Sequence, residues 1–317
     1  MRIGGRHRIF PSGTFAIALA LAFASCAQNV KITAPRYALV YGVQNYPNAS
    51  HLTYTLNDAT AISQLLSSQN WTTKLALDSD ATRADMVGDI SNLAASVQSN
   101  STVLFYFSGH GDLTNDNSTG IIAPYDTDFE RNSDGTPIKV NGIDQILETT
   151  VISAPQLASM LAALPTKNVI VILDSCYSGN FVSSGSAIDV SPQDYSSMPS
   201  FSAFSTAVAN FGSLLSANAS AGGQKSPIVI SAAGSEEFSY DGTDAMQHGV
   251  FTYFLLQAAS KGDSNGDGVV TTTEAFAYTQ KAIISWGSSL TAAEHANFIP
   301  FLPHISGGTR DLVLFTD

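Results

Sequence analysis

Short hydrophobic runs alternate with amphipathic stretches along most of the chain. Runs that are apolar throughout are typical of strands buried on both faces of a sheet. The runs that predict strands, of which the second is weak and the last lies at an edge, cover residues 37–43, 74–77, 103–107, 169–173, 228–230 and 311–315. The chain is therefore expected to build one buried sheet.

Between these runs, apolar side chains recur every three or four residues, which is the period of an amphipathic helix. The helices predicted in this way cover residues 57–69, 82–97, 153–164 and 249–260. Asn57 and Asp58 offer an N-cap for the first of them, and Thr82 opens the second. Ser153-Ala-Pro-Gln156 is a capping box with proline in the first turn.

Strands that alternate with helices imply an α/β fold, with a mainly parallel sheet covered by helices on both faces. One domain of about 280 residues is large enough for it. Two insertions interrupt the alternation: residues 112–150 are rich in Asp, Asn, Thr and Gly, and residues 183–225 are rich in Ser, Ala and Gly. Connections of this length are usually functional or disordered.

The first 25 residues have the pattern of an export signal. Three arginines precede an apolar run at residues 15–23, which is too short to span a bilayer. Residues 22–24 form an A-x-A type cleavage site, and residues 21–26 (LAFASC) resemble a bacterial lipoprotein signal that ends in Cys26. Phe23 stands where that motif usually has leucine.

We therefore expect residues 1–25 to be a lipoprotein-type signal peptide and Cys26 to carry a lipid that anchors the protein to a membrane. Residues 26–35 would form a tether, and residues 36–317 the folded domain. This places the protein in the bacterial cell envelope, on the periplasmic side or at the surface. The alternative is an ordinary secretory signal with an incidental Cys26, which would make the protein secreted.

The chain is acidic and carries few charges. It has 26 Asp and Glu against 14 Lys and Arg, a formal charge of −12, and loss of the three signal arginines takes this to about −15. Such a chain lacks the basic footprint that nucleic acid requires, whereas basic substrates are tolerated. With 44% hydrophobic and 13% charged residues, it does not have the composition of a disordered protein.

The chain has two cysteines, Cys26 and Cys176. Exported proteins often use cysteines in pairs, as disulfides. If Cys26 is the lipid attachment point, Cys176 is the single thiol of the folded domain. A leftover thiol in an exported chain suggests a reactive group.

Two predicted strands run into reactive side chains. The strand at 103–107 leads into Ser-Gly-His110-Gly111, and the strand at 169–173 leads into Asp174-Ser-Cys176-Tyr-Ser-Gly. Ligands of open α/β sheets bind at the carboxyl ends of the strands, where the two motifs would meet. A thiolate activated by an imidazole is a strong nucleophile, and the glycines leave room for a substrate backbone. Each motif alone is also typical of a loop histidine or a small core cysteine.

At these residues the chain resembles the caspase-like cysteine peptidases, specifically the bacterial metacaspase-like (orthocaspase) branch of the peptidase C14 family. The resemblance covers about residues 36–317 and implies a caspase-like three-layer α/β/α sandwich with about six strands. It implies that Cys176 attacks the scissile carbonyl and His110 protonates the leaving amine. The backbone N–H groups of Gly111 and Cys176 would then form the oxyanion hole.

The chain departs from the family at two points. Tyr177 stands where metacaspases commonly have histidine, and the caspase pentapeptide Gln-Ala-Cys-x-Gly is absent. Asp174 lies two residues before the cysteine instead, at a metacaspase position that lines the S1 pocket and selects Arg or Lys. Coulomb complementarity predicts the same preference for a basic P1 side chain.

Asp58 matches a second family position proposed to line S1. Its alternative interpretation is the helix N-cap described above, and for Asp174 the alternative is a structural acid at a strand end. Lys225 is the only Lys or Arg between Lys167 and Lys261, in the region where caspase relatives carry an inter-subunit linker. It is a candidate autocleavage site, and otherwise an ordinary solvated lysine.

Residues 263–274 match the 12-residue EF-hand loop at every position, with Gly268 at the sharp turn. The predicted Ca²⁺ ligands are the side chains of Asp263, Asn265, Asp267, Thr271 and bidentate Glu274, with the carbonyl of Val269. Because no second loop is present to pair with it, we expect a structural site. The alternative is a turn rich in Asp, Asn and Gly that binds no metal. No motif for an organic cofactor is present, and the other histidines lack metal-ligand spacing.

The sequence thus predicts an exported cysteine endopeptidase that hydrolyses peptides or proteins after Arg or Lys through a Cys-His dyad, with possible self-processing in the 183–225 linker. Two rival functions remain. One is a legumain- or gingipain-like peptidase, which shares the His-Gly and Cys strand ends. The other is a catalytically inactive, calcium-stabilised caspase-like binding lipoprotein.

Overall fold

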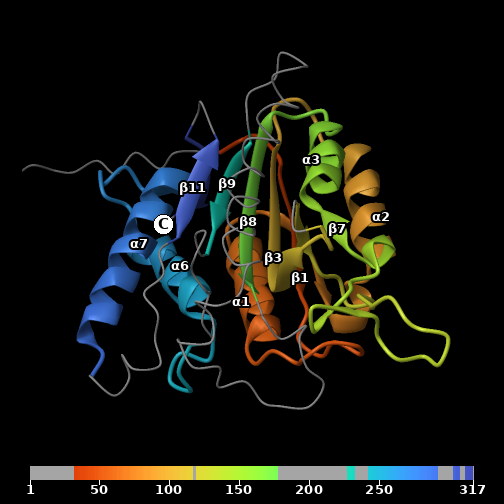
Figure 1. The fold of residues 1–317 in the computed structure, drawn as a ribbon. Helices are drawn as coiled ribbons and strands as arrows, with labels where there is room; N and C mark the ends of the chain where they lie inside the picture. The colour runs from red at the N-terminus through yellow and green to blue at the C-terminus, as the bar shows by residue number, and fades with distance from the viewer. Residues whose placement is uncertain are drawn as a thin grey trace, which may run out of the picture.

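The structure is a computed structural model that describes residues 32–116, 119–177, 227–232, 242–291, 303–307 and 311–316. A twisted sheet runs through its centre and helices cover both faces (Figure 1). This is the α/β/α sandwich that the sequence predicts. The predicted signal, Cys26, Lys225 and the insertion at 183–225 lie outside the described residues.

Six strands form the main path of the sheet, in the order β11-β9-β8-β3-β1-β2. Neighbours are parallel except for β11, which is antiparallel to β9. Two short strands extend the sheet, with β4 antiparallel to β3 and β7 antiparallel to β4. The bounds are β1 Arg36–Gly42, β2 Thr72–Leu77, β3 Thr102–Leu113, β4 Gly120–Ile122, β7 Ile152–Ser153, β8 Asn168–Tyr177, β9 Ile228–Ser231 and β11 His304–Gly307.

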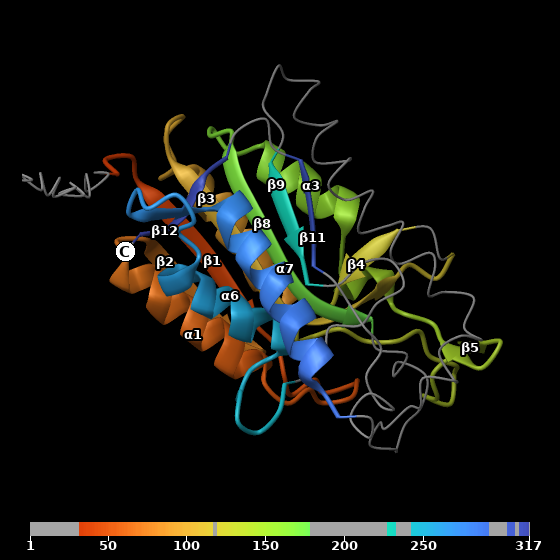
Figure 2. The ribbon, with the colours of Figure 1, turned by 90° about the vertical axis from the view of Figure 1, so that its left-hand side faces the viewer.

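Helices α1 (Thr55–Ser68), α6 (Val250–Lys261) and α7 (Thr272–Ser289) lie together on one face, and α2 (Arg83–Ala94) and α3 (Ala154–Ala162) lie on the other (Figures 1 and 2). Short 3₁₀ turns cover Asp78–Asp80 and Glu148–Thr150. Since side chains alternate along a strand, each central strand contributes to the hydrophobic cores on both faces of the sheet. In β1, Leu39 and Tyr41 pack under α2, while Ala38 and Val40 pack under α1 and α6.

Two of the predicted helix starts are confirmed. The Thr82 hydroxyl accepts the Asp85 N–H at 3.2 Å, and Ser153 with Gln156 forms the capping box of α3. The predicted N-cap at Asn57 and Asp58 is wrong, because α1 begins at Thr55 and both residues lie in its first turn. The Thr55 hydroxyl donates to the Val43 carbonyl at 2.8 Å, which ties this helix start to the end of β1.

The predicted edge strand at 311–315 is also wrong in its partner. Strand β12 (Val313–Thr316) pairs antiparallel with β10 (Val269–Thr271), in a separate two-stranded sheet. The edge of the main sheet is instead β11, whose His-Ile-Ser-Gly sequence offers a single apolar side chain and therefore no hydrophobic signal. Through β12 the C-terminal segment supports residues 269–271, which belong to the predicted calcium loop.

The described part of the 112–150 insertion has regular structure. It contains β4 and a small hairpin of β5 (Lys139–Val140) and β6 (Ile143–Asp144). Arg131 and Asp128 form an ion pair at 2.7 Å beside the hairpin.

Among the described residues, no helix is long and apolar enough to cross a bilayer.

Candidate active site

Strands β3 and β8 lie side by side and carry the two reactive motifs within their length. In the parallel register His110 is opposite Cys176, and Ser108 is opposite Asp174. The sequence predicted these motifs beyond the strands, which is wrong, because β3 continues to Leu113 and β8 to Tyr177. Strand β4 pairs with β3 at Gly111–Leu113 and keeps it extended. The two motifs therefore occupy neighbouring positions of one sheet.

The imidazole of His110 is held from three sides in the protein interior, with 1% of the residue exposed. Its Nε2 lies 2.8 Å from the Ser50 carbonyl oxygen, and its ring lies 4.7 Å from the Tyr46 ring between centroids. The His110 backbone N–H donates to the Tyr46 hydroxyl at 2.9 Å, and that hydroxyl donates to the Ala123 carbonyl at 2.8 Å. These contacts fix the orientation of the ring.

The same contacts define the protonation of His110. A carbonyl oxygen only accepts, so Nε2 carries the proton and Nδ1 carries the lone pair of the neutral ring. Burial lowers the pKa of His110 to about 4, although the bond to Ser50 works in the opposite direction. The ring is therefore neutral at physiological pH, which is the form that can accept a proton from a thiol.

Gly109 is needed next to this histidine for a steric reason. A β-carbon at Gly109 would stand 2.6 Å from Cζ of Phe107 and 2.7 Å from the Tyr46 hydroxyl. Gly111 lies between two strands, opposite Ile122 of β4 and Tyr177 of β8. The oxyanion role of the Gly111 and Cys176 N–H groups stays a prediction, as does the role of the Cys176 thiol.

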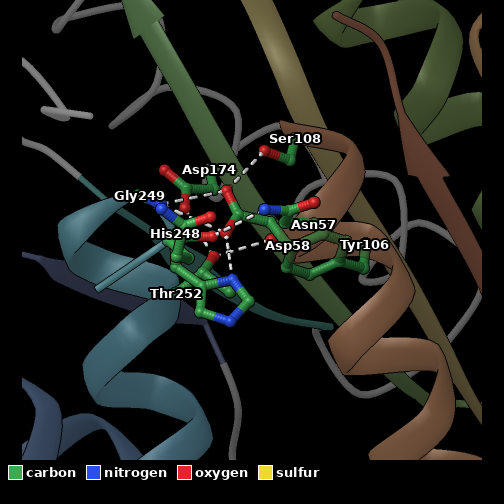
Figure 3. Close-up of polar contacts among 9 residues, drawn as sticks. Asn57, Asp58, Tyr106, Ser108, Asp174, His248, Gly249 and Thr252 are labelled. Carbon is green, nitrogen blue, oxygen red and sulfur yellow. Dashed lines mark hydrogen bonds and ion pairs between the residues drawn. The ribbon is translucent and has the colours of Figure 1, made fainter. Parts of the chain in front are cut away.

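A second group of polar side chains lies two positions earlier on the same strands (Figure 3). Asp58 from α1 is 2% exposed and Asp174 from β8 is 5% exposed. Asp58 accepts from His248 Nδ1 at 2.9 Å, from the Gly249 N–H at 3.1 Å, and from the Ser108 hydroxyl at 3.2 Å. Burial raises the pKa of Asp58, while these donors act to lower it.

Asp174 is bound through the start of α6. The Thr252 hydroxyl donates to Asp174 Oδ2 at 2.5 Å and also lies 2.6 Å from the Tyr106 hydroxyl. Burial, followed by the charges of Asp58 and Asp174, raises the pKa of Tyr106, which therefore stays a neutral phenol. This chain of hydroxyls links β3, α6 and β8.

The two carboxylates converge on Gly249, the N-cap of α6. Oδ2 of Asp58 and Oδ2 of Asp174 are each 3.2 Å from the point where a β-carbon of Gly249 would stand, so they lie within twice that distance of each other. The positive end of the helix dipole favours negative charge here. We call Asp58 and Asp174 the acidic pair. Its two carboxyl groups share a small, largely buried volume at the motif strands.

A family model described as the caspase domain matches residues 35–294. The chain belongs to this caspase-domain family of peptidases. Among solved structures, it is similar to protein GSU0716 from Geobacter sulfurreducens, at 17% identity and a TM-score of 0.50 over 87% of this chain and 95% of that one. This likeness concerns the fold alone. Comparison with curated proteins gave no match.

The family match covers the motif strands and the acidic pair of this caspase domain, and it ends before β11 and β12. Membership supports a peptidase that acts on proteins. Three residues that shape the site were not predicted from the sequence. Ser50 contacts His110 through its backbone carbonyl, and His248 lies far from both motifs along the chain, so neither carries a local signal. Ser108 belongs to the Ser-Gly-His-Gly motif, but its bond to Asp58 joins β3 to α1 and is therefore not visible in the sequence.

The predicted calcium loop of the caspase domain is compact. Asp263 accepts the N–H groups of Gly266, Asp267 and Gly268, and the Gly268 bond contributes most to a pKa of Asp263 below the ordinary value. Gly268 has φ +83°, as the sharp turn requires. Glu274 Oε1 accepts from the Ser264 hydroxyl at 2.7 Å, and Oε2 accepts from the Thr271 N–H, which brings the last loop position back to its beginning.

The donor chemistry of this loop fits Ca²⁺, because its ligands would be carboxylate, amide and carbonyl oxygens. The loop's own N–H and hydroxyl groups donate to its carboxylates and to the amide oxygen of Asn265. Among the described residues, His, Cys, Asp and Glu form no group of three or more that could hold a metal ion. Calcium binding at this loop therefore stays a prediction.

Proposed function

We propose that this caspase domain is a cysteine endopeptidase that hydrolyses peptide bonds after Arg or Lys. The observation that carries the proposal is the acidic pair beside the strands of His110 and Cys176. A cationic P1 side chain would gain from two nearby carboxylates in a desolvated site, and a P1 aspartate would be repelled. Ser108, opposite Asp174, adds a hydroxyl to the same place.

In the proposed mechanism, Nδ1 of His110 takes the proton of the Cys176 thiol. The sulfur forms a bond to the scissile carbonyl carbon, and the C–N bond breaks as the imidazolium returns its proton to the leaving amine. Water then hydrolyses the resulting thioester, which releases the acid and restores the thiol. The Ser50 carbonyl serves this cycle by holding the Nε2 proton, so that Nδ1 remains the nitrogen that exchanges protons.

Substrate profiling tests the proposal directly. A panel of fluorogenic peptides that differ only at P1 should show hydrolysis after Arg and Lys, lost in Cys176→Ala and in His110→Ala. A preference for Asn would favour a legumain-like enzyme. If a thiol-reactive basic peptidyl ketone fails to label Cys176 and no peptide is cut with calcium present, the caspase-like binding lipoprotein is favoured instead.

We further propose that the protein is exported and anchored through a lipid on Cys26. The lipoprotein-like signal at residues 21–26 supports this. Metabolic labelling with a palmitate analogue should modify the wild-type protein and move it to the membrane fraction. Cys26→Ser should be unlabelled and soluble in the periplasm or medium, and equal partition of both proteins would contradict the anchor.

Self-processing after Lys225 is a separate proposal, supported by its isolation as the one basic residue of a Ser- and Gly-rich insertion. Incubated wild-type protein should be cut there, whereas Lys225→Gln and Cys176→Ala should stay intact.

Finally, we propose that Ca²⁺ binds residues 263–274 as a structural ion. The match at every loop position and the closure of the loop through Glu274 support this proposal.

A further inference from the structure

We propose that His248 is an internal competitor for the acidic pair, so that the site accepts a basic side chain more readily as His248 loses its proton. The inference rests on the basic specificity proposed above. It assigns a regulatory and specificity role to a residue outside both reactive motifs. The contact that carries it is the ion pair between His248 Nδ1 and Asp58 Oδ1, at 2.9 Å.

Asp58 already receives donors from several directions. The Gly249 N–H approaches both of its oxygens, at 3.1 and 3.3 Å, and the Ser108 hydroxyl adds a bond to Oδ2. An incoming guanidinium or ammonium must therefore replace one of the existing donors. The Gly249 N–H belongs to the start of α6, and Ser108 is buried within β3, so neither leaves without moving the sheet or the helix.

His248 is the donor that can leave. Its side chain is 20% exposed, against 2% for Asp58, so it is the more solvent-accessible partner of the pair drawn in Figure 3. Its backbone is fixed, because the His248 carbonyl accepts the Gly242 N–H at 2.9 Å and the preceding Gln247 carbonyl accepts Asn57 Nδ2 at 3.0 Å. A rotation of one side chain would uncover Asp58 without displacing the loop.

His248 is also the donor that carries a positive charge when protonated. Within the described part of the chain, it is the one ion-pair partner of Asp58. The titratable groups that meet at this corner are Asp58 on α1, Asp174 on β8 and Tyr106 on β3. Asp244, earlier in the same loop, accepts from the Tyr54 hydroxyl at the start of α1. With His248 protonated, one carboxylate of the acidic pair is neutralised internally. With His248 neutral, both carboxylates face the incoming cation.

This arrangement couples protonation of His248 to the binding of a cationic substrate group. A bound cation and a protonated His248 repel each other across Asp58, so binding expels the proton. Imidazoles titrate between about pH 5 and 8. Over that range the affinity for a cationic group should rise with pH, at most about tenfold per pH unit for one proton released. A neutral group of the same shape should show no such rise.

The test measures binding without catalysis, in the full chain carrying Cys176→Ala. The probes are butylguanidine, a cation that represents the end of an arginine side chain, and butylurea, its neutral counterpart. Isothermal titration calorimetry at pH 5.5 and 7.5, in two buffers of different ionisation enthalpy, gives both the affinity and the protons released. The matched variant is His248→Asn, whose amide nitrogen can replace Nδ1 as a donor but does not titrate.

We expect butylguanidine to bind the His248 protein several-fold to tenfold more tightly at pH 7.5 than at pH 5.5, and to release a proton as it binds. The His248→Asn variant should bind butylguanidine better than the His248 protein at pH 5.5, which removes most of the difference between the two pH values. An equal pH dependence in both proteins would assign the effect to the acidic pair and overturn the role of His248. If the variant does not fold, the measurement on the His248 protein is sufficient, because binding without proton release would overturn the role of His248. If butylguanidine binds neither protein at either pH, the basic specificity itself fails, and this inference with it.

Discussion

His110 owes its chemical state to residues far from it in the chain. Tyr46 and Ser50 lie in the segment between β1 and α1. Nevertheless, the Tyr46 ring packs against the imidazole of His110, and the Ser50 carbonyl accepts its Nε2 proton. The sequence selected this histidine only in combination with Cys176, because the Gly-His-Gly motif and the cysteine motif each follow a hydrophobic run. The tautomer and the lowered pKa were not predictable, since they depend on a backbone carbonyl and on burial, which carry no sequence signature.

One prediction concerns the stability of the protein in acid. The folded pKa of His110 is about 4, below the ordinary value of about 6.5, so the folded state disfavours the proton. Stability from this group is fully present above pH 6.5 and is lost as the pH falls towards 4. Between pH 7 and 4.5 the loss should be roughly 2–3 kcal/mol. Urea unfolding at the two pH values measures it.

The control for that experiment is His110→Asn, which cannot titrate. Its unfolding free energy should fall less between pH 7 and 4.5, and the difference between the two proteins isolates His110 from the many carboxylates. Parallel acid curves for the two proteins would show that this histidine is not buried as a neutral ring.

A second residue-scale prediction concerns Asp174. Replacing a charge that meets an oppositely charged partner in a desolvated site costs about 2–5 kcal/mol. We expect Asp174→Asn to lower kcat/KM for an Arg peptide by about 100-fold, and to change cleavage of a neutral P1 peptide far less. Asp89→Asn is the matched control, because Asp89 is a buried acid under the opposite face, bonded to Tyr41 and Lys74. A similar loss in both variants would indicate damage to folding.

At the scale of elements, the hydrophobic pattern located the buried centre of each strand but not its ends. Residues 103–107 and 169–173 were predicted correctly, while the polar and glycine residues up to Leu113 and Tyr177 carry no apolar signal. Their extension depends on pairing between β3, β4 and β8, which is tertiary information. The start of α1 was missed for a similar reason, because it is set by a bond from Thr55 to Val43.

The extended part of β3 supplies a prediction about packing. Gly109→Ala would place a methyl group 2.7 Å from the Tyr46 hydroxyl, and Tyr46 must then shift away from His110. We expect peptidase activity to fall at least tenfold, with a stability loss of about 1–3 kcal/mol from overpacking. Activity assays and urea unfolding of the same samples measure both effects.

The matched control is Gly88→Ala in α2, where an added β-carbon meets nothing within 4 Å. Alanine in a helix interior is favoured over glycine by roughly 0.5–1 kcal/mol. Gly88→Ala should therefore stabilise the protein slightly and leave activity unchanged. Full activity in Gly109→Ala would show that the position of Tyr46 beside the His110 ring does not matter for the proposed peptidase activity.

At the scale of the whole molecule, the candidate calcium loop joins parts of the chain that are distant in sequence. Its residues 269–271 form β10, which pairs with β12 near the C-terminus. The Gln69 side chain at the end of α1 bonds both backbone groups of Thr316, at 2.8 and 3.1 Å. Asp311 accepts from Thr272 and Thr273 at the start of α7. The loop was predictable from its spacing, but its partner strand was not, because strand pairing is non-local.

This placement leads to a prediction about calcium. A ligand that binds only the folded state stabilises it by about 2.7 kcal/mol at one hundred times its dissociation constant. Because the loop ties α6 and α7 to the C-terminal strand, that stabilisation should appear as cooperative melting at a higher temperature. Adding CaCl₂ to chelator-treated protein should raise Tm by several degrees, and Asp263→Asn should remove most of the shift. Asp134→Asn, in an exposed turn of the insertion, should keep the shift.

If the ion is structural, adding calcium should change peptidase activity little at temperatures well below the melting temperature. An activity that requires calcium where the fold is intact would show that the loop acts on the active site itself. An unchanged Tm in the wild-type protein would mean that residues 263–274 form a turn closed by its own hydrogen bonds, with no role for metal.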